Sequence, residues 1–143
     1  LSVGRGTNSP FEQFGAPFID PKALLEALKS AALRGVRFER VEFVPTQGPH
    51  ARARCLGLKL TVLDAQAFLP VRTGIEIARA LHTLYATQWQ VEKLDKLRGH
   101  AQSLQALLAG AKTDAIESLW ATGIEDFRRR RLPYLHYPSC PRR

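Results

Sequence analysis

The feature that most constrains the fold is a regular alternation of apolar residues with small or polar residues over positions 55–63. A period of two places every second side chain on the same face of a β-strand. The pattern therefore predicts a strand with one apolar face over residues 55–63. The apolar members are Leu56, Leu58, Leu60 and Val62, and Gly57, Lys59 and Thr61 alternate with them.

A second strand is predicted over residues 36–44, but its apolar positions change face. Val36 and Phe38 share one face, whereas Val41 and Phe43 share the other. We predict a β-bulge or bend near Arg40, because one extra residue would explain the change of face. The loop that follows is predicted over residues 45–49.

Helical patterns flank the two strands. Asp20 can cap a helix whose first residue is Pro21, and Gly35 can end that helix. A second helix is predicted from about 69 to 87, a short third helix around residues 104–108, and a fourth that Pro133 ends. The apolar stripe of the first helix is Leu24, Leu25, Leu28 and Ala32, and the predicted face of the second is Val71, Ile75, Ala78, His82 and Tyr85.

The fourth helix is predicted to begin at a capping box formed by Asp114 and Glu117. Residues 1–17 are a Gly- and Pro-rich loop, and residues 89–99 form a connector. We therefore predict an α+β fold for residues 1–143: a single domain with a small β-sheet and about four helices. Residues before Gly4 or after Pro133 are candidates for added edge strands. The stripe of the fourth helix is Ile116, Leu119, Trp120, Gly123, Ile124 and Phe127.

The positive charge of the chain is concentrated at one end. The formal net charge is +8, and residues 128–143 hold six arginines and no acid. Cations are favourable at a helix C-terminus, so we interpret Arg128–Arg131 as a solvated helix end in a basic C-terminal tail. Phosphate binding by this tail remains a rival hypothesis, but no nucleic-acid motif accompanies it, and nucleic acid is not an expected partner. No apolar run reaches the roughly 20 residues of a membrane span.

Metal, cofactor and nucleophile chemistry find no support in the residue spacing. Cys55 and Cys140 are too few for a disulfide framework, and Cys55 is predicted to be buried packing. CxxC and HxxxH spacings are absent, so we predict no metal site and no cofactor. The sequence shows no Ser/His/Asp arrangement and no obvious carboxylate pair.

Three segments contain candidate binding residues. Arg5 lies between two glycines and could bind a carboxylate, while Ser2 and Thr7 offer hydroxyls to a sugar. Glu12 lies between aromatic residues in a Pro-bounded loop, a composition that suits a carbohydrate. His50 titrates near neutral pH. The alternatives are a tight turn with a solvated arginine, aromatic core anchors, and a merely exposed histidine.

Resemblance to a known family favours the carbohydrate interpretation. The opening SVGRGT, then Pro10-Phe11-Glu12 and Gly15-Ala16-Pro17, resembles the signature that opens the C-terminal half of the NamZ (YbbC-like) exo-β-N-acetylmuramidases. Similar segments follow in order along the chain. They are Val36-Arg37-Phe38, Phe43-Val44-Pro45-Thr46, Cys55-Leu56-Gly57, Phe68-Leu69-Pro70-Val71-Arg72, Lys93-Leu94-Asp95, and Phe127-Arg128 to Pro133-Tyr134-Leu135.

The resemblance implies a bacterial glycosidase that releases terminal N-acetylmuramic acid from peptidoglycan fragments. It implies a site in the cleft between a Rossmann-like N-terminal domain, which holds the main catalytic glutamate, and a smaller C-terminal domain. The catalytic residues would then lie outside this chain, with Glu12 a candidate assistant. Ser2, Arg5, Thr7, Glu12 and His50 are the candidate substrate-binding residues, with Arg5 the candidate for the lactyl carboxylate.

Two further expectations concern the whole protein. Because the chain contains no methionine, we expect it to be part of a longer protein whose missing domain lies upstream and whose place is the periplasm or outside the cell. Phe11, Phe14 and Phe18 are candidates for a surface which that domain covers. The alternative function is a non-catalytic module that binds glycan or peptidoglycan.

Overall fold

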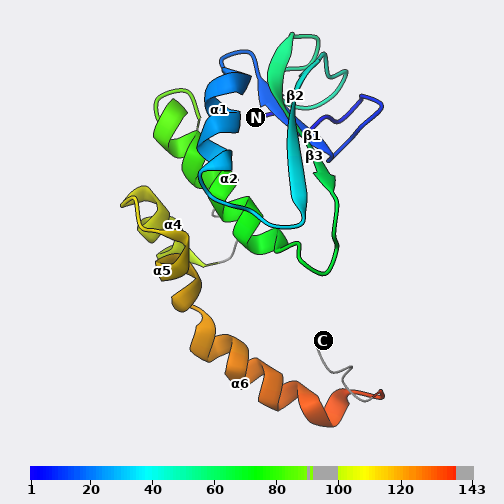
Figure 1. Ribbon diagram of the computed structural model, residues 1–143. Coiled ribbons are helices and arrows are strands. Elements are labelled where there is room, and N and C mark those ends of the chain that lie inside the picture. Colours follow the sequence, from blue (N-terminus) through cyan, green and yellow to red (C-terminus); the bar gives the residue numbers. More distant parts are fainter. Residues whose placement is uncertain (90, 92–99, 138–143) are drawn as a thin grey trace. The chain divides into compact units, whose positions relative to one another are not determined.

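The structure is a computed structural model that describes residues 1–89, 91 and 100–137 (Figure 1). Its contacts divide the chain into two compact units, Leu1–Gly99 and His100–Arg143. The predicted connector segment Lys93-Leu94-Asp95 and the end of the basic tail, including Cys140, lie outside the described residues.

A three-stranded antiparallel sheet forms the first unit's framework. Its strands are β1 (Gln13–Ala16), β2 (Val36–Phe43) and β3 (Cys55–Val62), in the order β1-β3-β2. The central strand is therefore β3, the strand with the most regular alternation in the sequence. Together with the helices this confirms the predicted α+β class. The loop predicted over 1–17 was wrong at its end, because β1 lies there.

The pairing of β1 with β3 depends on two glycines, and the alternation of apolar residues in the sequence does not predict it. Gly15 lies opposite Gly57 in the ladder, and a Cβ on Gly57 would lie 1.9 Å from the carbonyl oxygen of Phe14. The two backbones approach too closely for any side chain at Gly57. Ser2 adds a further bridge on the outer side of β1, where it exchanges both backbone hydrogen bonds with Gly15, at 2.8 and 3.0 Å. The predicted contribution of residues before Gly4 to the sheet edge is thus one bridge.

The bulge predicted near Arg40 was wrong. The register runs without interruption from Val36 opposite Val62 to Phe43 opposite Cys55. The apolar residues change face because different elements cover the two faces of this strand. Phe38 faces α1 (Pro21–Lys29), whereas Phe43 is buried on the opposite face, against Gly15.

The first helix, α1, begins as predicted. The Asp20 carboxylate accepts hydrogen bonds from the backbone N–H groups of Lys22 and Ala23, and Pro21 is the first helical residue. The helix ends at Lys29, with Ser30 as its C-cap, rather than at Gly35, and Ala32 beyond it is exposed. Gly35, with a φ of 70°, instead turns the chain into β2.

Helix α2 (Pro70–Tyr85) packs against α1, and α1 packs against the sheet (Figure 1). Ile75, Ala78 and Tyr85 are buried as predicted, but Val71 is 64% exposed. The core of this unit includes the fully buried Leu24, Leu58 and Leu81.

The described residues of the second unit, 100–137, contain three helices where one short and one longer helix were predicted. They are α4 (Ala101–Leu108), α5 (Thr113–Ser118) and α6 (Ala121–Arg131), followed by the 3-10 turn η2 (Leu132–Tyr134). The predicted capping box was wrong, because the N-cap position of α5 is Lys112 and Asp114 lies inside the first turn. The predicted continuous fourth helix is interrupted before α6, where Trp120 takes the N-cap position. Leu107 and Ile116 are buried.

Candidate functional site

Two glycines shape the first loop, residues 2–12, which we call the Arg5 loop and which carries four of the predicted binding residues. Gly4 and Gly6 have φ angles of 73° and 74°, which glycine adopts without steric cost. A Cβ on Gly4 would lie 2.7 Å from Cγ of Gln13, and one on Gly6 would lie 2.1 Å from Oγ1 of Thr46. The chain therefore needs glycine on each side of Arg5, both for its backbone conformation and for its close neighbours.

Hydrogen bonds from Thr7 hold the loop together. Its hydroxyl donates to the Gly4 carbonyl at 2.7 Å and accepts from the Gln13 side-chain amide at 2.9 Å and the Ser9 backbone N–H at 3.2 Å. Ser2 is only 1% exposed, and its hydroxyl accepts a hydrogen bond from the Gly4 backbone N–H at 3.3 Å. Both predicted sugar-binding hydroxyls are thus engaged in fixing the backbone around Arg5.

Arg5 and Phe11 form the exposed tip of the loop. The guanidinium carbon of Arg5 lies 5.5 Å from the centre of the Phe11 ring, a cation–π arrangement. The Phe11 ring is 71% exposed, and its backbone φ is 65°, in a region that costs a non-glycine residue about 1–3 kcal/mol. A strained backbone that presents an aromatic ring to solvent is a pattern typical of a binding site rather than of a core anchor.

Glu12 and Lys59 form a charged pair next to this tip. The Lys59 ammonium lies 3.5 Å from a carboxylate oxygen of Glu12 and 3.4 Å from the Ser9 hydroxyl. Glu39 is opposite Lys59 in the β2–β3 ladder, so an acid also flanks the lysine on the neighbouring strand. Lys59 was not among the site residues predicted from the sequence. A lysine at a central position of the most regular strand was the available signal that this face of the sheet is polar.

The second loop, residues 45–54, is tied to the first. The Thr46 hydroxyl donates to the Gly6 carbonyl at 3.1 Å. His50 and Arg52 both have φ angles of 64°, so three of the four described non-glycine residues with positive φ lie in these two loops. The two linked loops therefore contain most of the positive-φ non-glycine backbone among the described residues.

His50 is half-buried rather than simply exposed. Its ring makes an edge-to-face contact with Phe18, which in turn contacts Tyr85. Burial lowers the pKa of His50 below its ordinary value. The contact with Phe18 makes His50 an aromatic anchor for the second loop.

Of the three phenylalanines predicted to form an aromatic surface, only one is exposed to solvent. Phe11 is exposed, Phe18 is half-buried, and Phe14 is only 8% exposed, so the prediction for Phe14 was wrong. Phe14 lies on the face of the sheet that α1 covers, because it pairs with Leu58. Cys55 is fully buried and free, as its position at the start of a strand predicted, and burial raises its pKa.

Comparison with known families identifies the chain's relatives. Residues 1–137 match the family model described as "Exo-beta-N-acetylmuramidase NamZ, C-terminal". The chain belongs to this family. It is 34% identical over 140 residues to the peptidoglycan β-N-acetylmuramidase NamZ of Bacillus subtilis (strain 168), a match that covers 96% of the chain and 34% of the relative. The chain thus spans about a third of the length of this curated relative.

A solved structure shares the fold. The crystal structure of a DUF1343 family protein from Bacteroides fragilis NCTC 9343 superposes with a TM-score of 0.70 at 18% sequence identity. The match covers 96% of this chain and 38% of that protein. The fold of the NamZ C-terminal family is therefore shared across a wide sequence divergence.

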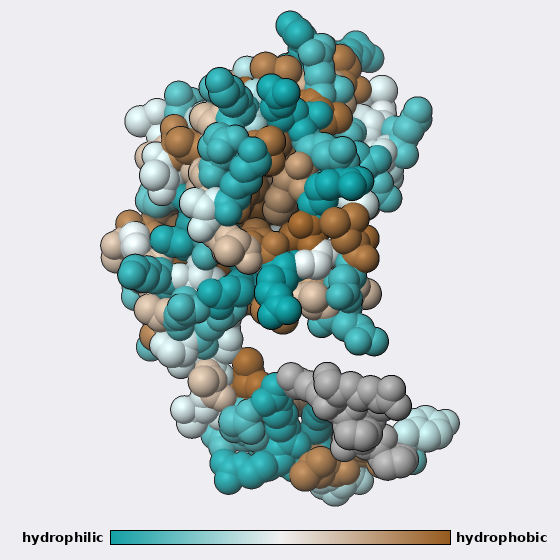
Figure 2. Space-filling view, in the orientation of Figure 1, coloured by the Kyte–Doolittle hydropathy of each residue, from teal (hydrophilic) through white to brown (hydrophobic). Residues whose placement is uncertain are grey.

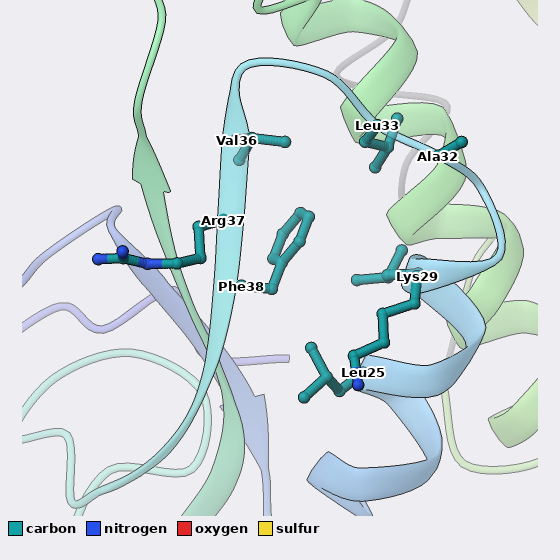
Figure 3. A pocket seen from close by; sticks show the side chains of 8 residues that line it. Leu25, Lys29, Ala32, Leu33, Val36, Arg37 and Phe38 are labelled. Atoms are coloured by element: carbon teal, nitrogen blue, oxygen red, sulfur yellow. The ribbon is translucent and has the colours of Figure 1, made fainter.

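This NamZ-family chain also has an apolar cleft, which lies on the face of the sheet opposite to Lys59. It has a volume of about 320 Å³ and lies between the end of α1 and β2 (Figure 3). Leu25, Leu33, Val36 and Phe38 point into it, while Arg37 points away. Phe38 and Lys59 occupy opposite faces by register, so the cleft is separate from the Arg5 loop.

The described arginines at the end of α6 have the arrangement predicted for a helix terminus. Arg128 pairs with Glu125 and Arg129 with Asp126, each one turn back along the helix. Among the described residues, no cluster of histidine, cysteine and acidic side chains is arranged to hold a metal ion. None of the helices in the described ranges combines the length and apolar character of a membrane span.

Proposed function

We propose that this chain is the sugar-binding C-terminal domain of a longer exo-β-N-acetylmuramidase. The observation that carries the proposal is the placement of Arg5 over the exposed Phe11 ring, beside Glu12 and Lys59, on a loop fixed by two glycines. Membership of the NamZ C-terminal family supplies the substrate class. A sugar with a lactyl carboxylate needs a cation, an apolar surface and polar partners for its hydroxyls, and the loop offers all three.

Each side chain has a distinct proposed role. Arg5 binds the carboxylate of N-acetylmuramic acid, since a guanidinium can form two parallel hydrogen bonds to it. Phe11 contacts an apolar face of the sugar ring. Glu12 and Lys59 bind hydroxyl groups, and Glu12 is the group available to assist catalysis. Ser2 and Thr7 hold the loop, and His50 anchors the neighbouring loop.

The bond-breaking chemistry belongs, in this proposal, to another domain of the longer protein. Most glycosidases use two carboxyl groups that flank the scissile bond. Glu12, the acid of the Arg5 loop, is instead paired with Lys59 and exposed to solvent. The chain therefore contributes orientation of the sugar and closure of the site rather than the principal acid or nucleophile.

A glycan-binding module without chemistry is the second candidate. It is favoured by one observation: the Arg5–Phe11 pair and the bonds that support it all form within this chain. A module of this kind would bind muramic acid glycans on its own. A cleft-completing domain would bind them poorly until the other domain is present.

The test is release of 4-nitrophenol from its β-N-acetylmuramic acid glycoside. We would assay this chain alone, the remaining part of the longer protein alone, and the two mixed, with the N-acetylglucosamine glycoside as the matched control. The proposal predicts activity only in the mixture and a preference for the glycoside that carries the lactyl group. No activity in the mixture, with both parts folded and the chain binding the glycan unaided, would instead establish the binding module.

A further inference from the structure

The last helix of the second unit displays apolar side chains that no other helix of that unit covers. We call residues 121–137 the α6–η2 segment. No residue of α6 is buried, and Phe127, Tyr134 and Tyr137 are 56%, 79% and 85% exposed. Figure 2 shows brown apolar side chains among the teal ones over this segment. The exposed apolar set is Ile124, Phe127, Leu132, Tyr134, Leu135 and Tyr137.

The segment has little intrinsic stability as an isolated helix. Helices shorter than about 12–15 residues are marginal in water, and α6 has 11 residues, including Gly123. A glycine in a helix interior lowers helix stability relative to alanine. The two local ion pairs of Arg128 and Arg129 are exposed, and exposed ion pairs contribute little to stability. Tertiary packing against another surface is the remaining source of stability.

The family comparison shows that the segment is part of the domain and not an appendage. The match to the NamZ C-terminal family continues through residue 137 and so includes all of α6 and η2. The curated relative is about three times as long as this chain, since the chain covers 34% of it. A protein of that length has other domains available to cover the segment.

Charge indicates the chemistry of the covering surface. Arg128 and Arg129 are neutralised by acids one turn back, whereas Arg130 and Arg131 have no acidic partner within the described ranges. The segment therefore combines an apolar side, which contains Ile124 and Phe127, with two unneutralised cations in its last turn. The complementary surface is an apolar patch bordered by acidic side chains.

We infer that the α6–η2 segment is a docking element that binds the other domain of the longer protein. This inference rests on the proposed function for the existence of that domain, but not on its activity. Ile124, Phe127, Leu132 and Tyr134 insert into an apolar patch of the other domain, and Arg130 and Arg131 pair with acids at its border. Docking through this element would hold the domain that carries the Arg5 loop against the other domain of the same protein.

Hydrogen–deuterium exchange tests the inference directly. The exchange of peptides from residues 121–137 is compared between the isolated chain and the longer protein. We expect these amides to exchange at least about tenfold more slowly in the longer protein, because a covered helix opens less often. Equal exchange in the two proteins, with the first unit protected in both, would overturn the inference. So would full protection in the isolated chain, which would mean that the segment packs within its own chain or against a second copy.

Substitutions within α6 identify the contact. In the longer protein, Phe127→Ser is expected to restore fast exchange of residues 121–137. The control Thr122→Ser, which lies roughly 140° around the same helix from Phe127, is expected to leave protection unchanged. The double substitution Arg130→Glu and Arg131→Glu is expected to weaken protection more at low salt than at high salt, because salt screens charge pairs at the surface. If both Phe127→Ser and the double arginine variant retain protection of residues 121–137, as the control does, the assigned contact is contradicted.

The outcomes separate this inference from the proposed function. If the longer protein protects residues 121–137 but does not cleave the muramic acid glycoside, docking stands and the proposed activity fails. If it cleaves the glycoside while residues 121–137 exchange freely, the activity stands and docking fails. Binding of the isolated chain to anionic vesicles or single-stranded DNA, abolished by the double arginine substitution while exchange in the longer protein is unaffected, would also overturn docking.

Discussion

The Arg5 loop and the α6–η2 segment differ in how their conformations are held. The loop has no regular secondary structure, yet buried Ser2, the Thr7 hydroxyl and two close-packed glycines fix its path. Helix α6 has regular backbone hydrogen bonds and no buried side chain. Irregular backbone can therefore be the better-anchored part of this molecule, while a regular helix can lack any buried side chain within its own unit.

The largest expected effect comes from adding one methyl group to each unit. Gly57→Ala places a Cβ 1.9 Å from the Phe14 carbonyl oxygen, so the sheet must separate there, and we expect a loss of more than about 3 kcal/mol in the free energy of unfolding. Gly123→Ala in α6 meets nothing within 4 Å and should stabilise the helix by about 0.5–1 kcal/mol. Urea unfolding followed by circular dichroism measures both. Effects of the same sign would break the contrast between the two regions.

Truncating large apolar residues sharpens the same contrast. Leu58 is fully buried in the central strand, so Leu58→Ala should cost about 2–5 kcal/mol. Phe127→Ala in the isolated chain should cost less than about 0.5 kcal/mol, because the ring is 56% exposed. Thermal unfolding of the two variants, side by side, provides the comparison. A large cost at Phe127 in the isolated chain would show that α6 already has a packing partner there.

Removing the Thr7 hydroxyl tests how the loop is held. Thr7→Val keeps the shape of the side chain but loses three hydrogen bonds and leaves the Gly4 carbonyl unpaired by this side chain, so we expect a loss of about 1–3 kcal/mol. Ser118→Ala, which loses one exposed bond to the Ala115 carbonyl, is the matched control with a loss near zero. Chemical denaturation measures the difference. Similar small effects in both variants would mean that the loop is not held as described.

The smallest effect expected is a pH dependence from His50. Because burial lowers the pKa of this ring in the folded state, the unfolded chain binds the proton more tightly. Stability should therefore fall as the pH drops below about 6.5, the ordinary histidine pKa. His50→Gln is expected to flatten this slope in unfolding curves recorded between pH 5 and 7, whereas His136→Gln, in the exposed end of the second unit, is the control. An unchanged slope in His50→Gln would remove His50 as its source.

The regular parts of the fold could be predicted from the sequence because their signals are local. The alternation in β3 and the Asp20-Pro21 start of α1 each depend on neighbouring residues, and the structure confirms both. β1 could not be predicted, because its pairing depends on Gly57, 42 positions from its partner Gly15. The change of face in β2 was misinterpreted as a bulge because a sequence does not show which elements cover each face of a strand.

The candidate site was predicted in part for the same reason. Arg5 and its two glycines are adjacent in the sequence, so the unusual backbone there was foreseeable. The pairing of Glu12 with Lys59 was not, since it requires β1 to lie beside β3. Ser2 and Thr7 were assigned to sugar binding, although their hydroxyls bond within the loop, because a sequence shows donors and acceptors but not which are already paired.

The most direct test of the central claim is the effect of Arg5→Ala on cleavage of the β-N-acetylmuramic acid glycoside by the longer protein. A lost charged hydrogen bond of about 1.5–3 kcal/mol corresponds to a fall in kcat/KM of roughly 10- to 100-fold. Arg54→Ala, which removes an exposed arginine paired with Glu42, is the matched control and should leave kcat/KM unchanged. Our account predicts that only Arg5→Ala loses this activity, with the N-acetylglucosamine glycoside unaffected. Wild-type kcat/KM in Arg5→Ala would contradict the assignment of this loop as the sugar-binding site.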